Sequence, residues 1–288
     1  MEGAIKYTFL RRVPDFWSIE NDIIDSLWGI KIAIIGIGSL GLESLESLPV
    51  SLISKENSII ESLTVYDDTD FCCRDSEYSN YNHYITEELQ KQDFLYCVGN
   101  IDDETVLENV CNLSSIFKET APSNKYSIFV SCGKIEKEYI QRLTYHYDTL
   151  IFVDDEKLLL SPFYMLFVEM QKAGFVSLDF SDVMSINKRL TTGYFFEYTR
   201  GSVSKLAQLK ELLENSMVNN NLGNTKNLIA NVQISLSESF YPEELNDIAN
   251  TFFDYIKEAV WSANISTSLI DGEFQIKLIY GVDNSLQN

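Results

Sequence analysis

The sequence lacks the long apolar runs that mark a membrane protein. A membrane-spanning helix needs roughly 20 mostly apolar residues, whereas apolar stretches such as residues 32–37 have only the length of a strand. Residues 1–16 contain no apolar core followed by a small-residue cleavage site, so the sequence predicts no signal peptide. We therefore expect a cytoplasmic protein with no transmembrane segment.

Basic residues are scarce. Lysine and arginine number 22 against 43 aspartates and glutamates, which gives a formal net charge of −21. A surface this acidic repels the phosphates of nucleic acids and of anionic lipids, so we expect no nucleic-acid partner. The same charge favours solubility and attracts cations such as Mg²⁺ or K⁺.

Cysteine and histidine are also few. The five cysteines are odd in number and form no CxxC motif, which argues against a disulfide framework and against a zinc site. Cys97 and Cys132 lie in apolar, strand-like segments and are expected to be reduced core thiols. With only two histidines besides, we predict no metal site and a reducing compartment.

The first half of the chain alternates strands and helices. Residues 31–37 form a continuous apolar run, as expected for a strand buried on both faces of a parallel sheet. Further strands are predicted at 62–67, 126–132 and 149–153, with a turn opening into a helix at 38–48 and helices at 102–120 and 134–146. This alternation predicts an α/β fold with a Rossmann-like parallel sheet.

The second half has a different order of strands and helices, which predicts a smaller α+β domain. Helices are expected at 157–174 with an interruption near Pro162, at 181–190, at 202–217 with Ser202 as the N-cap, and at 242–260. Strands are expected at 193–199, 228–236, 263–270 and 273–281. We place the two domains at residues 1–172 and 173–288.

The first candidate site is a G-x-G-x-x-G motif between the first strand and the first helix, formed by Gly36, Gly38 and Gly41. Glycines at these positions let the backbone turn sharply and let a phosphate approach the amides at a helix N-terminus. The motif predicts that the three glycines bind a nucleotide. The alternative is a tight turn packed against the sheet.

A second candidate follows the next strand, where the chain reads Tyr66-Asp67-Asp68-Thr69-Asp70. An acidic residue at this place can accept hydrogen bonds from a ribose, which makes Asp67 and Asp70 candidate nucleotide-binding residues. The alternative is a solvated acidic loop.

A third candidate is the carboxylate pair Asp179 and Asp182, three residues apart near the start of a helix. Two carboxylates at this spacing can polarise a water molecule or bind a cation. The alternative is an acidic first turn that stabilises the helix dipole.

The sequence around this pair resembles a known family. Residues 174–183, GFVSLDFSDV, are similar to the G-L-I-N-L-D-F-A-D-V loop of FtsZ, which in that family reaches into the nucleotide site of the next subunit and promotes GTP hydrolysis. Residues 148–153 and 157–159 resemble the strand that precedes the loop. Residues 231–236 resemble the FtsZ C-terminal strand, and residues 243–245 resemble the helix that follows it. The last FtsZ hairpin is similar to residues 263–265 and 270–279. The chain thus resembles the tubulin/FtsZ superfamily over residues 148–282, and more weakly over 31–133.

This resemblance implies a two-domain cytoskeletal protein that uses GTP and Mg²⁺. It also implies head-to-tail self-association, in which Asp179 and Asp182 act in catalysis on the nucleotide of a neighbouring subunit. Head-to-tail contacts propagate into filaments unless the rotation between subunits closes a ring.

The sequence departs from the family at the phosphate cradle. FtsZ and tubulin carry a loop of the G-G-G-T-G-T-G type after the third strand, whereas this strand ends at Cys132 and Gly133 and continues into Lys134-Ile135-Glu136-Lys137-Glu138. Bulky charged residues cannot offer the close backbone amides of such a cradle. We therefore predict a pseudo-GTPase that acts by self-assembly or by binding another FtsZ-like protein. A filament-forming GTPase with an altered cradle is the alternative.

A further alternative comes from another class. The first half also resembles the ThiF/ubiquitin-activating group, because Asp67-Asp68-Thr69-Asp70 and Ser79-Asn80-Tyr81-Asn82-His83 echo its D-x-D and S-N-L-N-R-Q segments. The arginine of the second segment is absent, and no catalytic cysteine motif follows. An adenylating enzyme thus stays open beside the two FtsZ-like readings.

Overall fold

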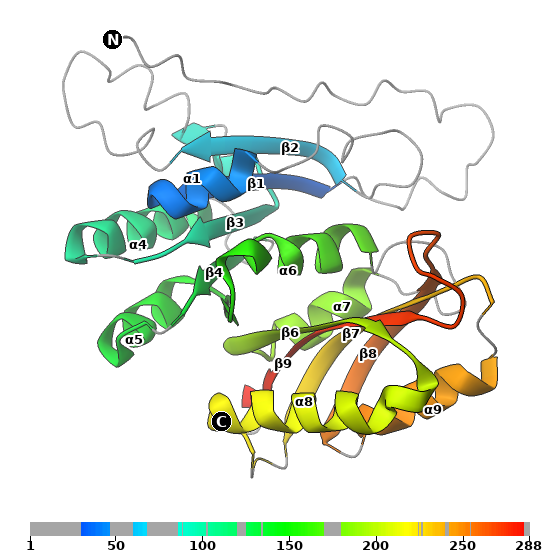
Figure 1. The fold of residues 1–288 in the computed structure, drawn as a ribbon. Coiled ribbons are helices and arrows are strands. Elements are labelled where there is room, and N and C mark those ends of the chain that lie inside the picture. Colours follow the sequence, from blue (N-terminus) through cyan, green and yellow to red (C-terminus); the bar gives the residue numbers. More distant parts are fainter. Residues whose placement is uncertain are drawn as a thin grey trace, which may run out of the picture. The chain divides into compact units, whose positions relative to one another are not determined.

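The computed structural model describes residues 30–46, 60–67, 86–87, 89–101, 103–119, 125–133, 135–169, 180–223, 225, 227–239, 242–253 and 255–284. These residues form two compact units (Figure 1). The first unit contains the described residues up to Asp148 together with Asp155–Leu160, and the second contains Thr149–Asp154 and the described residues from Ser161 onward. The expected domain boundary between residues 172 and 173 lies outside the described residues and stays a prediction.

The first unit is built on a parallel sheet. Its strands are β1 (Ile30–Ile37), β2 (Ile60–Asp67), β3 (Phe94–Gly99) and β4 (Tyr126–Cys132), in the order β2-β1-β3-β4. Its helices are α1 (Gly38–Glu46), α4 (Glu104–Lys118) and α5 (Lys137–His146), and a short 3₁₀ turn, η4, spans Glu156–Leu158. The Rossmann-like sheet predicted from the sequence is confirmed.

Local sequence accounts for these elements. The interior strands are apolar along nearly their whole length, because helices pack on both faces of a parallel sheet. The helix α4 begins where the Asp103 carboxylate accepts a hydrogen bond from the backbone N–H of Val106 at 2.9 Å. Its apolar stripe, which includes Leu107, Val110 and Phe117, is then buried in the core.

The second unit contains a mixed sheet in the order β5-β6-β9-β7-β8. The strands are β5 (Thr149–Val153), β6 (Thr192–Gly201), β7 (Leu228–Leu236), β8 (Ile256–Ile265) and β9 (Phe274–Val282). β9 is antiparallel to β6 and β7, whereas the β5–β6 and β7–β8 pairs are parallel. The helices are α6 (Ser161–Tyr164), the π-helix η5 (Met165–Glu169), α7 (Phe180–Asn187), the 3₁₀ turn η6 (Val203–Lys205), α8 (Leu206–Asn219) and α9 (Pro242–Phe253).

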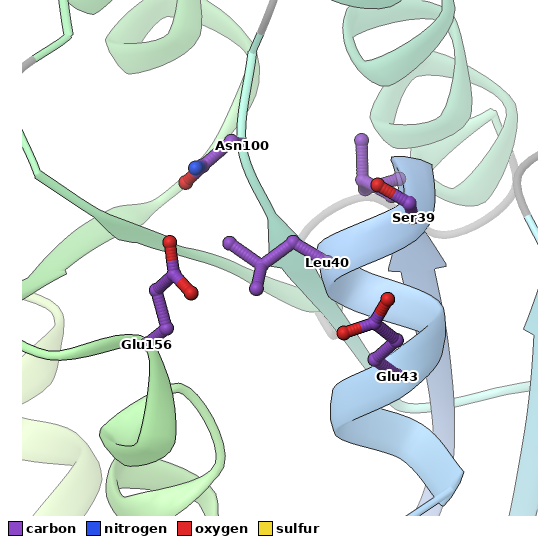
Figure 2. Close-up of a pocket in the computed structure, with 6 residues that line it drawn as sticks. Ser39, Leu40, Glu43, Asn100 and Glu156 are labelled. Carbon is purple, nitrogen blue, oxygen red and sulfur yellow. The ribbon is translucent and has the colours of Figure 1, made fainter.

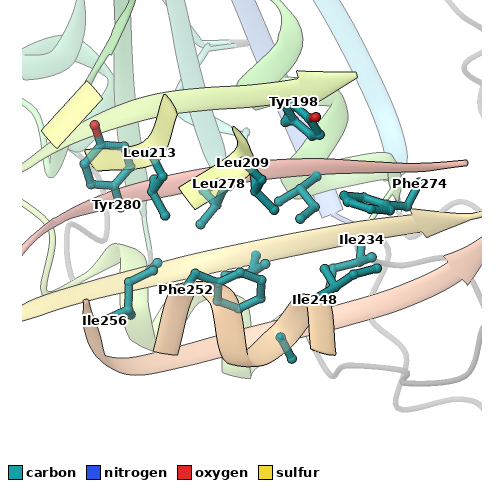
Figure 3. Packing of buried hydrophobic residues seen from close by; sticks show 14 of the residues in the cluster. Tyr198, Leu209, Leu213, Ile234, Ile248, Phe252, Ile256, Phe274, Leu278 and Tyr280 are labelled. Carbon is teal, nitrogen blue, oxygen red and sulfur yellow. The ribbon is translucent and has the colours of Figure 1, made fainter. Parts of the chain in front are cut away.

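One face of this mixed sheet carries the apolar core of the second unit (Figure 3). Leu209 and Leu213 of α8 and Phe252 of α9 are buried against alternate residues of β7 and β9, such as Ile234 and Leu278. Full burial of a large apolar side chain stabilises the fold by about 1.5–3 kcal/mol. The predicted α+β arrangement of the second half is therefore confirmed.

Several predicted elements of the second half are wrong in extent, among them the helix expected over 157–174, which the structure divides into η4, α6 and η5 with the break before Pro162. The helix expected over 242–260 ends at Phe253, and β8 begins at Ile256 rather than at 263. Residues 256–265 pair with β7 along its whole length. Strand preference depends strongly on such pairing and burial, which a local pattern does not contain.

The start of α8 also differs from the prediction. Ser202 is not its N-cap, because the 3₁₀ turn η6 intervenes and Lys205 occupies the cap position of α8. The Ser202 hydroxyl instead lies 2.9 Å from the hydroxyl of Ser204. Short 3₁₀ turns are frequent at helix termini, and the side-chain pattern alone does not separate them from the α-helix.

Candidate functional site

The G-x-G-x-x-G motif forms the turn from β1 into α1. Gly38 begins α1 with φ of 63°, a left-handed conformation that favours glycine. A Cβ on Gly41 would lie 2.2 Å from the carbonyl oxygen of Val98, and one on Gly36 would lie 2.9 Å from the carbonyl carbon of Gly41. Close packing of α1 against β1 and β3 therefore explains Gly36 and Gly41 without a phosphate.

A further glycine, which the sequence analysis did not select, belongs to the same packing. Gly99 ends β3 with φ of 147°, and a Cβ there would lie 2.1 Å from the carbonyl oxygen of Ile37. The signal for it was weak, because Gly99 stands outside the motif. Its place beside Ile37 follows from the parallel pairing of β1 with β3.

A pocket of about 290 Å³ lies where β1 and β3 end (Figure 2). Leu40 and Glu43 project from α1 on the side that faces Glu156 of η4. The lining residues are Ile37, Ser39, Leu40, Glu43, Asn100 and Glu156. Pockets beyond the carboxyl ends of parallel strands are the usual ligand sites of such sheets, so this is the candidate functional site.

The charge of the pocket is the wrong sign for a phosphate. Partial positive charge at the start of α1 favours an anion, but Glu43 and Glu156 place two carboxylates on the lining. The described residues that line the pocket include no lysine or arginine, and neither carboxylate has a cationic partner within the described part of the chain. The pocket therefore attracts cations and repels a polyphosphate.

Asn100 joins the ends of two strands beside the pocket. Its Oδ1 accepts a hydrogen bond from the Ser131 hydroxyl and one from the backbone N–H of Cys132, both at 3.2 Å. This fixes the end of β4 against the end of β3. Sequence reasoning missed Asn100, Glu43 and Glu156, because single polar residues outside a motif carry no signal that distinguishes them from surface residues.

The segment after β4 offers no second cradle among the described residues. Gly133 follows β4 with φ of 79°, and α5 begins at Lys137. Its N-cap position is Glu136, whose side chain makes no capping hydrogen bond, and Glu138 stands in the first turn. Carboxylates near a helix N-terminus already offset its partial positive charge and repel a phosphate there.

The predicted acidic residues are placed only in part. Asp67 ends β2 with its backbone beside Gly36, which brings it to the same end of the sheet as the pocket. Asp182 is exposed in the first turn of α7, in the second unit, and its carbonyl oxygen accepts a hydrogen bond from the Ser185 hydroxyl at 2.6 Å. Asp70 and Asp179 lie outside the described residues, so their roles stay predictions.

Three further predicted features concern metal sites, membrane-spanning helices and the segment of the adenylating alternative. No group of three or more His, Cys, Asp or Glu side chains in these ranges could hold a metal ion. None of the described helices combines the length and apolarity needed to span a bilayer. The segment Ser79–His83, on which the adenylating alternative rests, lies outside the described residues.

Solved structures share this architecture. An FtsZ variant from M. jannaschii matches with a TM-score of 0.59 at 16% identity, over 88% of this chain and 92% of the other. CetZ from Methanosaeta thermophila matches with a TM-score of 0.57 at 13% identity, over 87% and 86%. CetZ2 from Haloferax volcanii, solved as a GTPγS-bound protofilament, gives 0.54 at 9% identity, over 88% and 94%. The chain has the FtsZ fold.

The FtsZ fold covers most of both chains in these comparisons, including the first unit, where the sequence resemblance was weak. The FtsZ-like fold that the sequence resemblance implied is thus confirmed. No protein-family model matches the sequence, and no curated protein matches it significantly. Identities this low show a common fold and leave the chemistry to be argued from the site.

Proposed function

We propose that this FtsZ-fold chain is a cytoskeletal or scaffold protein that acts through assembly and does not hydrolyse GTP. The observation that carries the proposal is the pair Glu43 and Glu156 on the pocket at the ends of β1 and β3. A γ-phosphate in this pocket would face two negative charges, and none of the described lining residues is a lysine or arginine that could offset them. The lining residues therefore do not fit GTP.

Assembly is the function that remains once nucleotide chemistry is set aside. CetZ2, which shares the fold, was solved as a protofilament. We propose self-association or association with another FtsZ-like protein, in the cytoplasm. Asp182 is exposed on α7 and is available to a partner. Mg²⁺ has no implied catalytic role in this proposal, because the phosphates that it would bridge have no cradle.

A filament-forming GTPase is the second candidate. The glycine turn into α1 keeps the geometry in which a helix N-terminus meets an anion. CetZ1 of Haloferax volcanii, a neighbour with a TM-score of 0.50, was solved with GDP bound. This candidate requires that the negative charge of Glu43 and Glu156 be neutralised by protons or cations, or that a change in the pocket move the two carboxylates away from the phosphate.

Calorimetric titration of the purified chain with GTP and Mg²⁺ separates the two candidates. We expect no binding at millimolar GTP. Sedimentation and electron microscopy without nucleotide should nevertheless reveal self-association, or association with an added FtsZ-like protein. Micromolar GTP binding together with phosphate release that rises with protein concentration would instead establish the GTPase.

A charge variant tests the pocket itself. The double substitution Glu43→Gln and Glu156→Gln removes both carboxylates and hence the repulsion of phosphate, so it should give weak GTP binding, in the millimolar range, that wild type lacks. The matched control is Glu211→Gln with Glu238→Gln, because both glutamates are exposed in the second unit and lie outside the pocket. Equal behaviour of the two variants would refute the electrostatic explanation. ATP–pyrophosphate exchange by the wild-type chain would point to the adenylating class.

A further inference from the structure

The strand β7 separates two buried faces of different character. Val232 and Ile234 point into the apolar core under α8 and α9, whereas Asn231, Gln233 and Ser235 alternate with them and point to the opposite face. Helix α7 packs on β7 and β8. Asn231 and Gln233 are fully buried on this second face. Buried polar groups are normally hydrogen-bonded, so the second face needs a complete account of its partners.

Polar residues of four strands stand in register across this face. Cross-strand pairing places Glu197 of β6 beside Lys277 of β9, Lys277 beside Gln233 of β7, and Gln233 beside Ser262 of β8. Directly paired residues point to the same face of a sheet. We call these four residues the polar row.

The charged half of the polar row is satisfied by protein. The Lys277 ammonium donates to both carboxylate oxygens of Glu169, at 2.6 and 2.7 Å. Glu197 accepts a hydrogen bond of 2.6 Å from the Gln275 amide. The pKa of the Glu197 carboxyl is raised above its usual value, because burial outweighs the opposing effects of the Lys277 charge and the hydrogen bond from Gln275. Both carboxylates therefore have partners.

The neutral half of the polar row is not satisfied. Gln233 donates to the Ser235 hydroxyl at 2.8 Å, but its Oε1 has no partner, and neither has the hydroxyl of Ser262. Nearby, Asn231 donates to Asn187 at 2.8 Å while its Oδ1 is also without a partner. Exchanging the amide oxygen and nitrogen of Gln233 would leave an amide NH₂ unpaired instead, so the deficit does not depend on that assignment.

We propose that internal water molecules bind at this polar face, one of them between Gln233 and Ser262. The unsatisfied groups call for a small ligand that can both donate and accept hydrogen bonds, and Gln233 and Ser262 are direct cross-strand neighbours within reach of one bridging molecule. Water satisfies buried groups of this kind in many proteins and typically makes about three hydrogen bonds. A second molecule would serve Asn231.

A metal cation fits the same oxygens less well. The three atoms belong to neutral groups, and the carboxylates of the face are already occupied by Lys277 and Gln275. The Lys277 ammonium also stands in the same row. A metal cation there would be repelled by the Lys277 ammonium. It would also find no unpaired carboxylate whose attraction could offset the cost of removing its hydration shell.

The sign of one stability change tests the proposal. Ser262→Ala removes a hydroxyl that has no protein partner. If water bonds to it, the urea midpoint should fall by an amount similar to that in Ser216→Ala, a control that loses a 2.8 Å contact with the Tyr280 hydroxyl in the same unit. If the face is dry, the midpoint should rise, because an unsatisfied buried group is removed. A rise would overturn the proposal.

A crystal structure of the full chain, at a resolution that shows ordered water, gives an independent answer. We expect density within hydrogen-bond distance of both Gln233 Oε1 and Ser262 Oγ. Crystals soaked in rubidium chloride should show no anomalous peak at that place. An anomalous peak would assign the site to a cation, whereas the absence of density would show that the face is dry. Either result would overturn the proposal. Neither measurement depends on whether the chain binds GTP.

Discussion

Arg189 allows a quantitative test of what holds the second unit together. Its guanidinium donates to both carboxylate oxygens of Glu258, at 2.6 and 2.9 Å, and pairs with Asp283 through Nε and Nη2. The Asp283 side chain is only 1% exposed, whereas that of Glu258 is 48% exposed. Arg189→Met keeps most of the aliphatic volume but removes the guanidinium that pairs with the buried Asp283 carboxylate.

The burial of Asp283 sets the size of the effect. Removing one partner of a buried ion pair costs about 3–5 kcal/mol. Arg189 itself is 26% exposed, so water can reach part of the gap, and we expect the lower end, about 3 kcal/mol. For a chain of this length such a loss lowers Tm by about 6–12 °C.

Urea denaturation followed by circular dichroism measures this change. The control is Arg142→Met, which breaks an ion pair with Glu104 whose two side chains are 39% and 56% exposed. Exposed pairs contribute little, so this variant should denature close to wild type. Equal losses in the two variants would refute the argument that burial of Asp283 determines the cost.

Two other predictions concern the first unit. Gly41→Ala should lower the free energy of unfolding by about 1–3 kcal/mol, because the new Cβ would lie 2.2 Å from the Val98 carbonyl oxygen, a backbone atom that cannot rotate away. The control in urea denaturation is Gly133→Ala, whose Cβ would meet nothing within 4 Å, so that it measures the cost of a positive φ alone. A wild-type urea midpoint for Gly41→Ala would contradict the packing explanation. Burial and the charges of Lys118 and Arg142 lower the pKa of His146 below 6.5, so the unfolded chain binds the proton more tightly and stability is lost as the pH falls below that value. His146→Gln should flatten this part of the stability–pH curve, and an unchanged slope would mean that His146 is not its source.

The sequence predicted the fold where a segment is buried on both faces or alternates cleanly. The strands at 126–132, 149–153 and 228–236 were predicted with the bounds that the structure gives. The segment around Cys97 was recognised as apolar and strand-like, but no strand bounds were predicted for it, and the structure gives β3 over Phe94–Gly99. The start of β8 was missed because its strand character comes from pairing with β7.

The site was predictable only where a motif exists. The glycine motif located the turn from β1 into α1 and hence the edge where the pocket lies. It did not distinguish phosphate binding from helix packing, which the contacts of Gly41 decide. Glu43 and Glu156 are 113 positions apart (156 minus 43), and only the folded chain brings them to one pocket. Their charge reverses the expectation that the motif alone suggests.

The alternation along β7 also protects the fold against misassembly. A slip of one residue against β8 or β9 would turn Asn231 and Gln233 toward α8 and α9, and would turn Val232 and Ile234 out of the apolar core. Both changes are unfavourable, so misregistered sheets lie well above the native one in free energy. The polar face of β7 thereby favours the native strand alignment while the sheet forms.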